Sequence, residues 1–163
     1  MKLTLSLIIA LAVIALCSTS AFAVGPFSMT YGPGAAPGTW IYTLINNDAP
    51  GGDVIPLYLD IYWDPAVASD YFTVVGAPAG WVVNPAYDFP AFDAVGNDPG
   101  PGEKLKGFEI AAPTPALFFT AYYSVLGEEQ TPYDGVAVPE PGSMMALLGG
   151  VASLGAMIRR RRA

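Results

Sequence analysis

Carboxylates are the most numerous groups in this chain that could do chemistry, and histidine is absent from all 163 residues. Two carboxylates at a suitable separation can hydrolyse a glycosidic bond by acid–base catalysis. Thirteen carboxylates lie between Val24 and Val138, but no spacing among them singles out a pair. The lack of histidine excludes Ser-His and Cys-His catalysis and His-based zinc sites. We therefore expect no catalytic residue, no enzyme activity and no cofactor.

Two clusters of carboxylates and amides lie on glycine-containing turns. They consist of Asn46, Asn47, Asp48 and Asp53, and of Asp93, Asn97 and Asp98. Oxygen ligands on loops suit Ca²⁺, although the spacing of an EF-hand is missing. Asn, Asp and Gly are also the ordinary residues of turns. We interpret both clusters as turns and expect no metal site, with calcium as the alternative.

Aromatic side chains on the predicted strands are a third candidate site. Four that we expect to be exposed are Tyr58, Tyr62, Trp81 and Tyr122. Their rings could stack on sugars, although strand aromatics more often fill a core or cover a sheet face. A carbohydrate-binding module acting on exopolysaccharide is therefore the alternative function.

Short segments of period two must position these side chains. They cover residues 40–45, 57–63, 71–75, 81–83, 105–110 and 117–125, and turn residues separate them. No segment has the pattern of a long amphipathic helix. The pattern predicts an all-β fold, an antiparallel β-sandwich whose two sheets enclose one core. The residues expected in that core are Trp40, Leu44, Leu57, Leu59, Ile61, Phe119 and Tyr123.

Three stretches also resemble surface-protein sandwiches of the immunoglobulin-like type. They are the Y-x-L-x-N-N pattern within residues 40–47, the P-x-G-W pattern of residues 78–81, and a Pro-Gly strand entry at residues 101–105. The resemblance implies an immunoglobulin-like sandwich and nothing about function.

The N-terminal residues 1–23 have the three parts of a signal peptide. Lys2 is followed by an apolar run over residues 3–16 and by Ala21-Phe22-Ala23, an A-x-A cleavage site. We expect signal peptidase to recognise Ala21 and Ala23 and to cut after Ala23. The only cysteine, Cys17, lies in this segment, so no disulfide supports the exported domain.

The C-terminal residues 138–163 form a second targeting segment. Pro139-Glu140-Pro141 precedes an apolar run over residues 143–158, which predicts a transmembrane helix of roughly 24 Å. The cytoplasmic anchor predicted after this helix consists of Arg159, Arg160, Arg161 and Arg162.

This tail resembles the PEP-CTERM sorting signal. The resemblance implies processing by exosortase in a Gram-negative bacterium that makes exopolysaccharide and biofilm. By the same resemblance, Pro139, Glu140 and Pro141 are recognition residues rather than catalytic ones. The prolines at this point also predict an extended segment outside any helix or central strand.

Residues 24–137 remain as one extracellular domain. Residues 24–138 contain two lysines and thirteen carboxylates, so their net charge is 2 − 13 = −11. This negative charge repels nucleic-acid phosphates. Glu128, Glu129 and Asp134, near Pro132, predict a solvated spacer between the last strand and the sorting motif.

These features predict a non-enzymatic surface or extracellular-matrix protein. It is anchored in the inner membrane before processing and then lies at the cell surface or outside the cell. The predicted partners are signal peptidase, exosortase, the membrane as a transient anchor, and exopolysaccharide as a candidate, but not nucleic acid.

Overall fold

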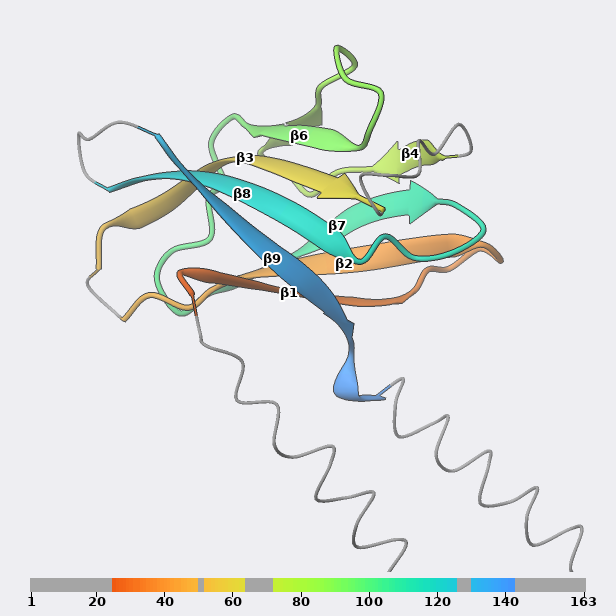
Figure 1. Cartoon of the computed structure of the whole chain (residues 1–163), viewed down its shortest axis with the longest axis horizontal. Helices are drawn as coiled ribbons and strands as arrows, with labels where there is room; N and C mark the ends of the chain where they lie inside the picture. The colour runs from red at the N-terminus through yellow and green to blue at the C-terminus, as the bar shows by residue number, and fades with distance from the viewer. Residues whose placement is uncertain (1–24, 50–51, 64–71, 126–129, 143–163) are drawn as a thin grey trace, which may run out of the picture.

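A computed structural model describes residues 25–49, 52–63, 72–125 and 130–142. The described chain is all-β, as the sequence predicted (Figure 1). Its nine strands are β1 (Phe27–Pro33), β2 (Thr39–Asn46), β3 (Val54–Tyr62), β4 (Thr73–Gly76), β5 (Trp81–Val83), β6 (Ala91–Ala94), β7 (Lys104–Ala111), β8 (Phe118–Val125) and β9 (Thr131–Pro139). No helix within these ranges is long and apolar enough to cross a membrane. The predicted signal peptide and transmembrane helix lie outside the described residues.

The strands form one continuous sheet in the order β4-β7-β2-β1-β9-β8-β3-β6-β5. Strand β9 joins the two halves of this sheet, because Thr131 to Val136 pair with β8 while Ala137 to Pro139 pair with β1. The β1–β9 pair is parallel, and the other strand pairs are antiparallel. The sheet curls round on itself, so that β3 and β8 lie across from β2 and β7 in Figure 1.

A single core fills the space that the curled sheet encloses. Phe92 on β6 and Trp81 on β5 both pack edge-on against Phe108 on β7, with ring centroids 5.0 and 5.2 Å apart. Phe27 on β1 meets Tyr123 on β8 at 5.6 Å in the same manner. Edge-to-face contacts of this kind add stability beyond the area that the rings bury. The two halves of the sheet are therefore held together by aromatic contacts between them.

Most predicted core residues occupy this core. Leu44, Leu59, Ile61 and Phe119 are buried, and Trp40 and Tyr123 are half-buried against them. Leu57 is the exception, because the β3–β8 register shifts between Pro56 and Tyr58. This irregularity breaks the alternation, so Pro56 is fully buried in place of Leu57.

Each predicted strand segment coincides with a strand of the structure, except that Trp63, Phe72 and Leu117 lie just outside β3, β4 and β8, and three strands were missed. These are β1, β6 and β9. The prediction of a solvated spacer before the sorting motif is wrong for Pro132 and Asp134, because both lie in β9, between β1 and β8. Glu128 and Glu129 lie outside the described residues.

Candidate functional site

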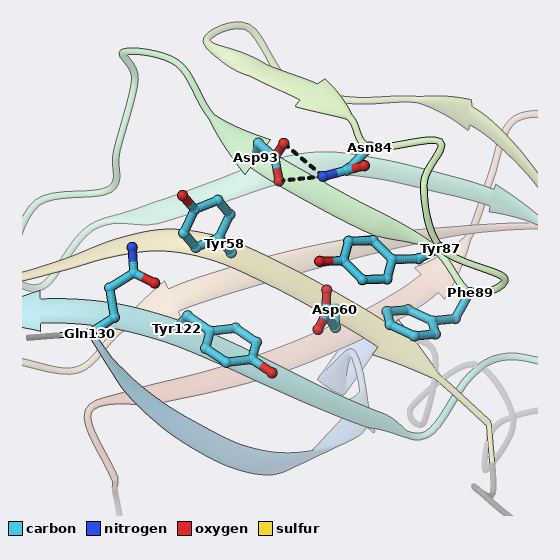
Figure 2. A pocket seen from close by; sticks show the side chains of 8 residues that line it. All are labelled: Tyr58, Asp60, Asn84, Tyr87, Phe89, Asp93, Tyr122 and Gln130. Atoms are coloured by element: carbon cyan, nitrogen blue, oxygen red, sulfur yellow. Dashed lines mark hydrogen bonds between the residues drawn. The ribbon is translucent and has the colours of Figure 1, made fainter.

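The outer face of β3, β6 and β8 carries a groove of about 560 Å³. The loop from Asn84 to Pro90 forms one wall of it, and β8 lies on the other side (Figure 2). Its lining combines four aromatic rings, two carboxylates and two amides. These residues are Tyr58, Asp60, Asn84, Tyr87, Phe89, Asp93, Tyr122 and Gln130.

Strand pairing brings the groove residues of β3, β6 and β8 together. Tyr58 lies opposite Asp93 of β6 on one side and opposite Tyr122 of β8 on the other. Cross-strand partners in antiparallel pairs project from the same face. The rings of Tyr58 and Tyr122 meet edge-on, with centroids 6.4 Å apart. The predicted alternation, with Tyr58 and Asp60 facing outward, is thus confirmed from Tyr58 to Tyr62.

The loop wall is fixed by hydrogen bonds at both ends. Asn84 Oδ1 accepts a bond of 3.0 Å from the backbone N–H of Ala86, which is the geometry of an Asx turn. At the other end, the backbone N–H of Ile61 donates to the carbonyl of Pro90 at 2.9 Å. Between these points, Tyr87 and Phe89 stack on each other with ring centroids 5.1 Å apart. The loop therefore presents a paired aromatic surface to the groove.

The two carboxylates of the groove differ in their surroundings. Asp93 accepts bonds from Nδ2 of Asn84 at 3.0 and 3.3 Å. Asp60 is half-buried, and its carboxylate makes no hydrogen bond to any other residue that the structure describes. The pKa of Asp60 is raised from 3.8 to about 6, mainly because the carboxylate is partly buried and also because Asp93 places a negative charge nearby. Asp60 is thus a carboxylate whose negative charge is not compensated.

The polar face continues beyond the groove along β8 and β9. Asp60 lies opposite Thr120, which in turn lies opposite Asp134. Thr120 Oγ1 donates to Oδ1 of Asp134 at 2.6 Å and lies 3.2 Å from the hydroxyl of Tyr62. Tyr62 itself stacks on Phe118 at 6.0 Å. Polar and aromatic groups therefore cover the outer side of this half of the sheet.

Of the four aromatics predicted to be exposed, Tyr58 and Tyr122 line the groove and Tyr62 lies on the same face. Trp81 was predicted wrongly, because it is only 4% exposed. The turn before it places Gly80 at φ +82°, a conformation that favours glycine, and turns the indole into the core. There its Nε1–H donates to the carbonyl of Asn97 at 2.9 Å.

Tyr87 and Phe89 were not among the predicted site residues. They alternate with Asp88 in the stretch between Pro85 and Pro90, which lies outside the predicted strand segments. Two aromatic residues spaced by two between two prolines were the available signal. Tyr87 is 54% exposed, and its ring lines the groove together with Phe89.

The first of the two amide and carboxylate clusters lies at the turn between β2 and β3. Asn46 is fully buried and donates through Nδ2 to the carbonyls of Val54 and Pro99, at 2.9 and 3.0 Å. Asp48 accepts from the backbone N–H groups of Ala49 and Val54. These contacts tie the β2–β3 turn to its neighbours.

The second cluster is spread over separate contacts. Asn97 donates to the carbonyl of Ala79 at 2.8 Å, while Asp93 belongs to the groove. Burial raises the pKa of Asp98, whose Oδ1 has no partner within the described ranges. No group of three acidic or cysteine side chains in the described part of the chain is arranged to hold a metal ion.

The first part of the predicted sorting motif is docked on the domain. Pro139 ends β9 opposite Tyr31, so the expectation that the motif lies outside any central strand is wrong at this residue. The backbone N–H of Glu140 donates to the carbonyl of Tyr31 at 2.8 Å. Its Oε1 lies 3.2 Å from Nζ of Lys106, in an ion pair. Pro141 is described but forms no part of β9.

The remaining predicted site residues lie outside the described residues. They are Ala21, Ala23, Arg159, Arg160, Arg161 and Arg162.

Comparison with known proteins identifies one motif in this chain. Residues 137–162 match the PEP-CTERM protein-sorting motif, which confirms the resemblance inferred from Pro139-Glu140-Pro141 and the tail behind it. The match begins inside β9, two residues before Pro139. No curated protein matches the chain.

Two kinds of solved structure show a weak likeness to the described fold. The GH20 exo-β-N-acetylglucosaminidase from Vibrio harveyi, in complex with N-acetylglucosamine, gives a TM-score of 0.42 at 9% identity over 72% of this chain and 18% of that chain. The chain therefore covers less than a fifth of the glycosidase. The cohesin module of a Clostridium perfringens family 33 glycoside hydrolase gives 0.35 at 8% identity, over 72% of this chain and 100% of the module. Likenesses this weak decide neither the type of fold nor the function.

Proposed function

We propose that this chain is a non-enzymatic, exported protein of the cell surface or extracellular matrix, sorted by exosortase through its C-terminal motif. The observation that carries the proposal is the match of residues 137–162 to the PEP-CTERM protein-sorting motif. Such a motif implies export followed by exosortase processing. The signal-peptide pattern of residues 1–23 supports the same route. The predicted biofilm role of the mature domain belongs to this proposal.

The geometry of the groove supports a non-enzymatic role. Acid–base hydrolysis of a glycoside needs two carboxylates free to act on the substrate. Both oxygens of Asp93 accept bonds from Asn84, which leaves Asp60 as the one carboxylate lining the groove without a partner among the described residues. None of the described residues that line the groove is a lysine, arginine or histidine, so none could stabilise the negative charge that develops in ester or amide hydrolysis.

We also propose a more specific description of the fold. We interpret the curled sheet as an immunoglobulin-like sandwich whose two sheets share β9. The change of pairing partner along β9, from β8 to β1, supports this interpretation. A strand that switches between sheets is a common way to make the corner of a sandwich.

The sorting proposal is tested by replacing Pro139 and Pro141 with alanine in the native host. We expect C-terminal processing to stop, so that the intact mass of the protein still includes the arginine tail. Pro132→Ala is the matched control, because Pro132 lies in the same strand but before the matched motif. Unchanged processing of the double variant would contradict the proposal.

A second candidate function is carbohydrate binding by the groove. The observation that favours it is the aromatic lining, in which Tyr58, Tyr87, Phe89 and Tyr122 surround Asp60 (Figure 2). Aromatic faces stack on the apolar faces of sugar rings, and amides and carboxylates accept or donate bonds to hydroxyls. Retention of the protein on the polysaccharide of its host, and its loss in Tyr122→Ala, tests this candidate. Release of new reducing ends would instead show an enzyme.

A further inference from the structure

The electrostatics of the groove restrict the kind of sugar that it can bind. Among the described residues that line it, Asp60 and Asp93 are the charged ones, and both are negative. Asp60 lies diagonally to Asp93 across the β3–β6 pair, since Asp60 lies opposite Ala91 and Asp93 lies opposite Tyr58. The domain has two lysines, Lys104 and Lys106, and both lie on β7 in the other half of the sheet. No cation of the described chain therefore compensates the charge of Asp60.

A neutral sugar would leave this imbalance in place. It would remove water from around Asp60 without supplying a positive charge, and desolvating an unpaired carboxylate is unfavourable. A ligand that carries a positive charge would compensate Asp60 and reduce its repulsion from Asp93. The same charge would interact favourably with the aromatic faces on either side.

The shape of the groove favours a ring over a bare ion or a flexible chain. Tyr87 and Phe89 stack with an angle of 23° between their planes, so they present a broad surface from the loop. Tyr58 and Tyr122 cross at 81° on the strand side. Figure 2 shows Asp60 between these two pairs. A volume of about 560 Å³ is within the usual range for small-molecule sites.

We propose that the groove binds a glycan containing amino sugars with free amines, whose rings stack on Tyr87 and Tyr122 and whose ammonium group lies against Asp60. The inference rests on the carbohydrate-binding candidate above and adds the charge of the sugar to it. Tyr58 and Phe89 complete the aromatic walls, and the Asn84 and Gln130 amides are placed to bond the hydroxyls.

The raised pKa of Asp60 agrees with this assignment. An ammonium group beside the carboxylate favours its ionised form, so ligand binding should lower the pKa of Asp60 again. In the free protein the ionised form of Asp60 is disfavoured, and a cationic ligand would stabilise that form.

The test compares two tetrasaccharides with the same sugar backbone, a glucosamine tetramer with free amines and an N-acetylglucosamine tetramer whose amines are acetylated and therefore uncharged. Calorimetric titration of the full chain in mild detergent, at neutral pH and low ionic strength, measures both affinities. We expect the glucosamine tetramer to bind about tenfold more tightly, and Asp60→Asn to abolish that preference. Asp53→Asn is the matched control, because Asp53 is exposed and lies outside the groove. Tyr122→Ala should weaken both tetramers.

The outcomes separate this inference from the candidate on which it rests. Equal affinity for the two tetramers would overturn the amino-sugar inference and leave carbohydrate binding standing. Failure of both to bind would overturn carbohydrate binding itself. A lysine tetrapeptide that bound as tightly as the glucosamine tetramer would show that charge alone is recognised, and it would also overturn the inference.

Discussion

Replacing Asp60 with asparagine should stabilise the fold at neutral pH. The carboxylate is half-buried, has no hydrogen-bond partner within the described residues and lies near Asp93. Asparagine has nearly the same shape and no charge, so it removes the repulsion and the desolvation of the anion together. Most substitutions at half-buried positions destabilise a protein, which makes the expected sign diagnostic.

The magnitude follows from the pKa of Asp60 in the folded and unfolded chain. A rise from 3.8 to about 6 corresponds to roughly 3 kcal/mol of destabilisation when the group is fully ionised. The groove is open to water, and solvent screening weakens such interactions. We therefore discount the value by about half and expect Asp60→Asn to raise the free energy of unfolding by ~1.5 kcal/mol at pH 7.

The pH dependence gives a second, independent check. The pKa of Asp60 is higher in the folded state, so the folded protein holds the proton more tightly between about pH 4 and pH 6. Below about pH 4 the carboxyl is protonated in both states, and the substitution should have almost no effect on stability. As the pH rises through about 6, the wild-type protein loses stability relative to Asp60→Asn.

Urea denaturation followed by tryptophan fluorescence measures the effect, because Trp81 is buried in the core. Asp53→Asn, at an exposed position outside the groove, should change the free energy of unfolding at pH 7 by less than about 0.5 kcal/mol. Destabilisation of Asp60→Asn at pH 7, or stabilisation of equal size at pH 4 and pH 7, would refute the reasoning about the uncompensated charge.

Three further predictions concern a buried hydrogen bond of β2, the turn before β5 and the docked sorting motif. Tyr42→Phe should destabilise the fold by about 1–3 kcal/mol in the same urea assay, because the Tyr42 hydroxyl accepts the buried N–H of Ala116 at 2.6 Å; no loss would contradict it. Gly80→Ala should lower the free energy of unfolding by at least ~1 kcal/mol, since φ is +82° there, whereas an unchanged value would refute this. Lys106→Gln should change the free energy of unfolding by less than ~1 kcal/mol, because the ion pair of Lys106 with Glu140 is exposed. The same substitution should speed C-terminal processing in pulse-chase measurements, because it releases Glu140 from the sheet. Slower processing would contradict the idea that docking restrains the motif.

Local pattern was sufficient to predict the long strands. Leu59 and Ile61 alternate with Tyr58, Asp60 and Tyr62, and the structure places the first pair inside and the others outside. That alternation depends only on the period of the strand, so it can be recognised without tertiary information. Leu57 shows the limit of this pattern, because the bulge depends on pairing with β8 and is marked in the sequence only by Pro56.

The missed strands have sequences that resemble turns. Strand β9 contains Pro132, Asp134, Gly135 and Pro139, which are all poor strand formers. It forms because β8 and β1 offer hydrogen-bonding edges on its two sides, which is a long-range effect. Strand β6 has only four residues, too few to show a period.

The groove could be predicted only in part, because it too depends on long-range strand pairing. Tyr58 and Tyr122 were identified from alternation within their own strands, but their meeting depends on the register of β3 with β8. Asp93 joins them through a separate pairing of β3 with β6. Tyr87 and Phe89 lie on a loop that is held by the hydrogen bonds Ala86 N–H to Asn84 Oδ1 and Ile61 N–H to the carbonyl of Pro90. Three segments far apart in the sequence thus converge, namely β3, the stretch from Asn84 to Asp93, and β8, and no pattern within one segment indicates that convergence.

The docking of the motif links sorting to the fold of the domain. Glu140 contacts Tyr31 of β1 and Lys106 of β7, and β1 pairs with β9 at Pro139. These contacts exist only when β7, β2 and β1 have assembled in order, since β2 and β1 separate Lys106 from β9. Only a folded domain can therefore hold Glu140 in place, while an unfolded one leaves the whole motif extended. A protease that binds Pro-Glu-Pro as an extended segment must first separate Glu140 from the sheet. This separation breaks the hydrogen bond from Glu140 N–H to Tyr31 and the exposed ion pair with Lys106, and its cost in free energy is small.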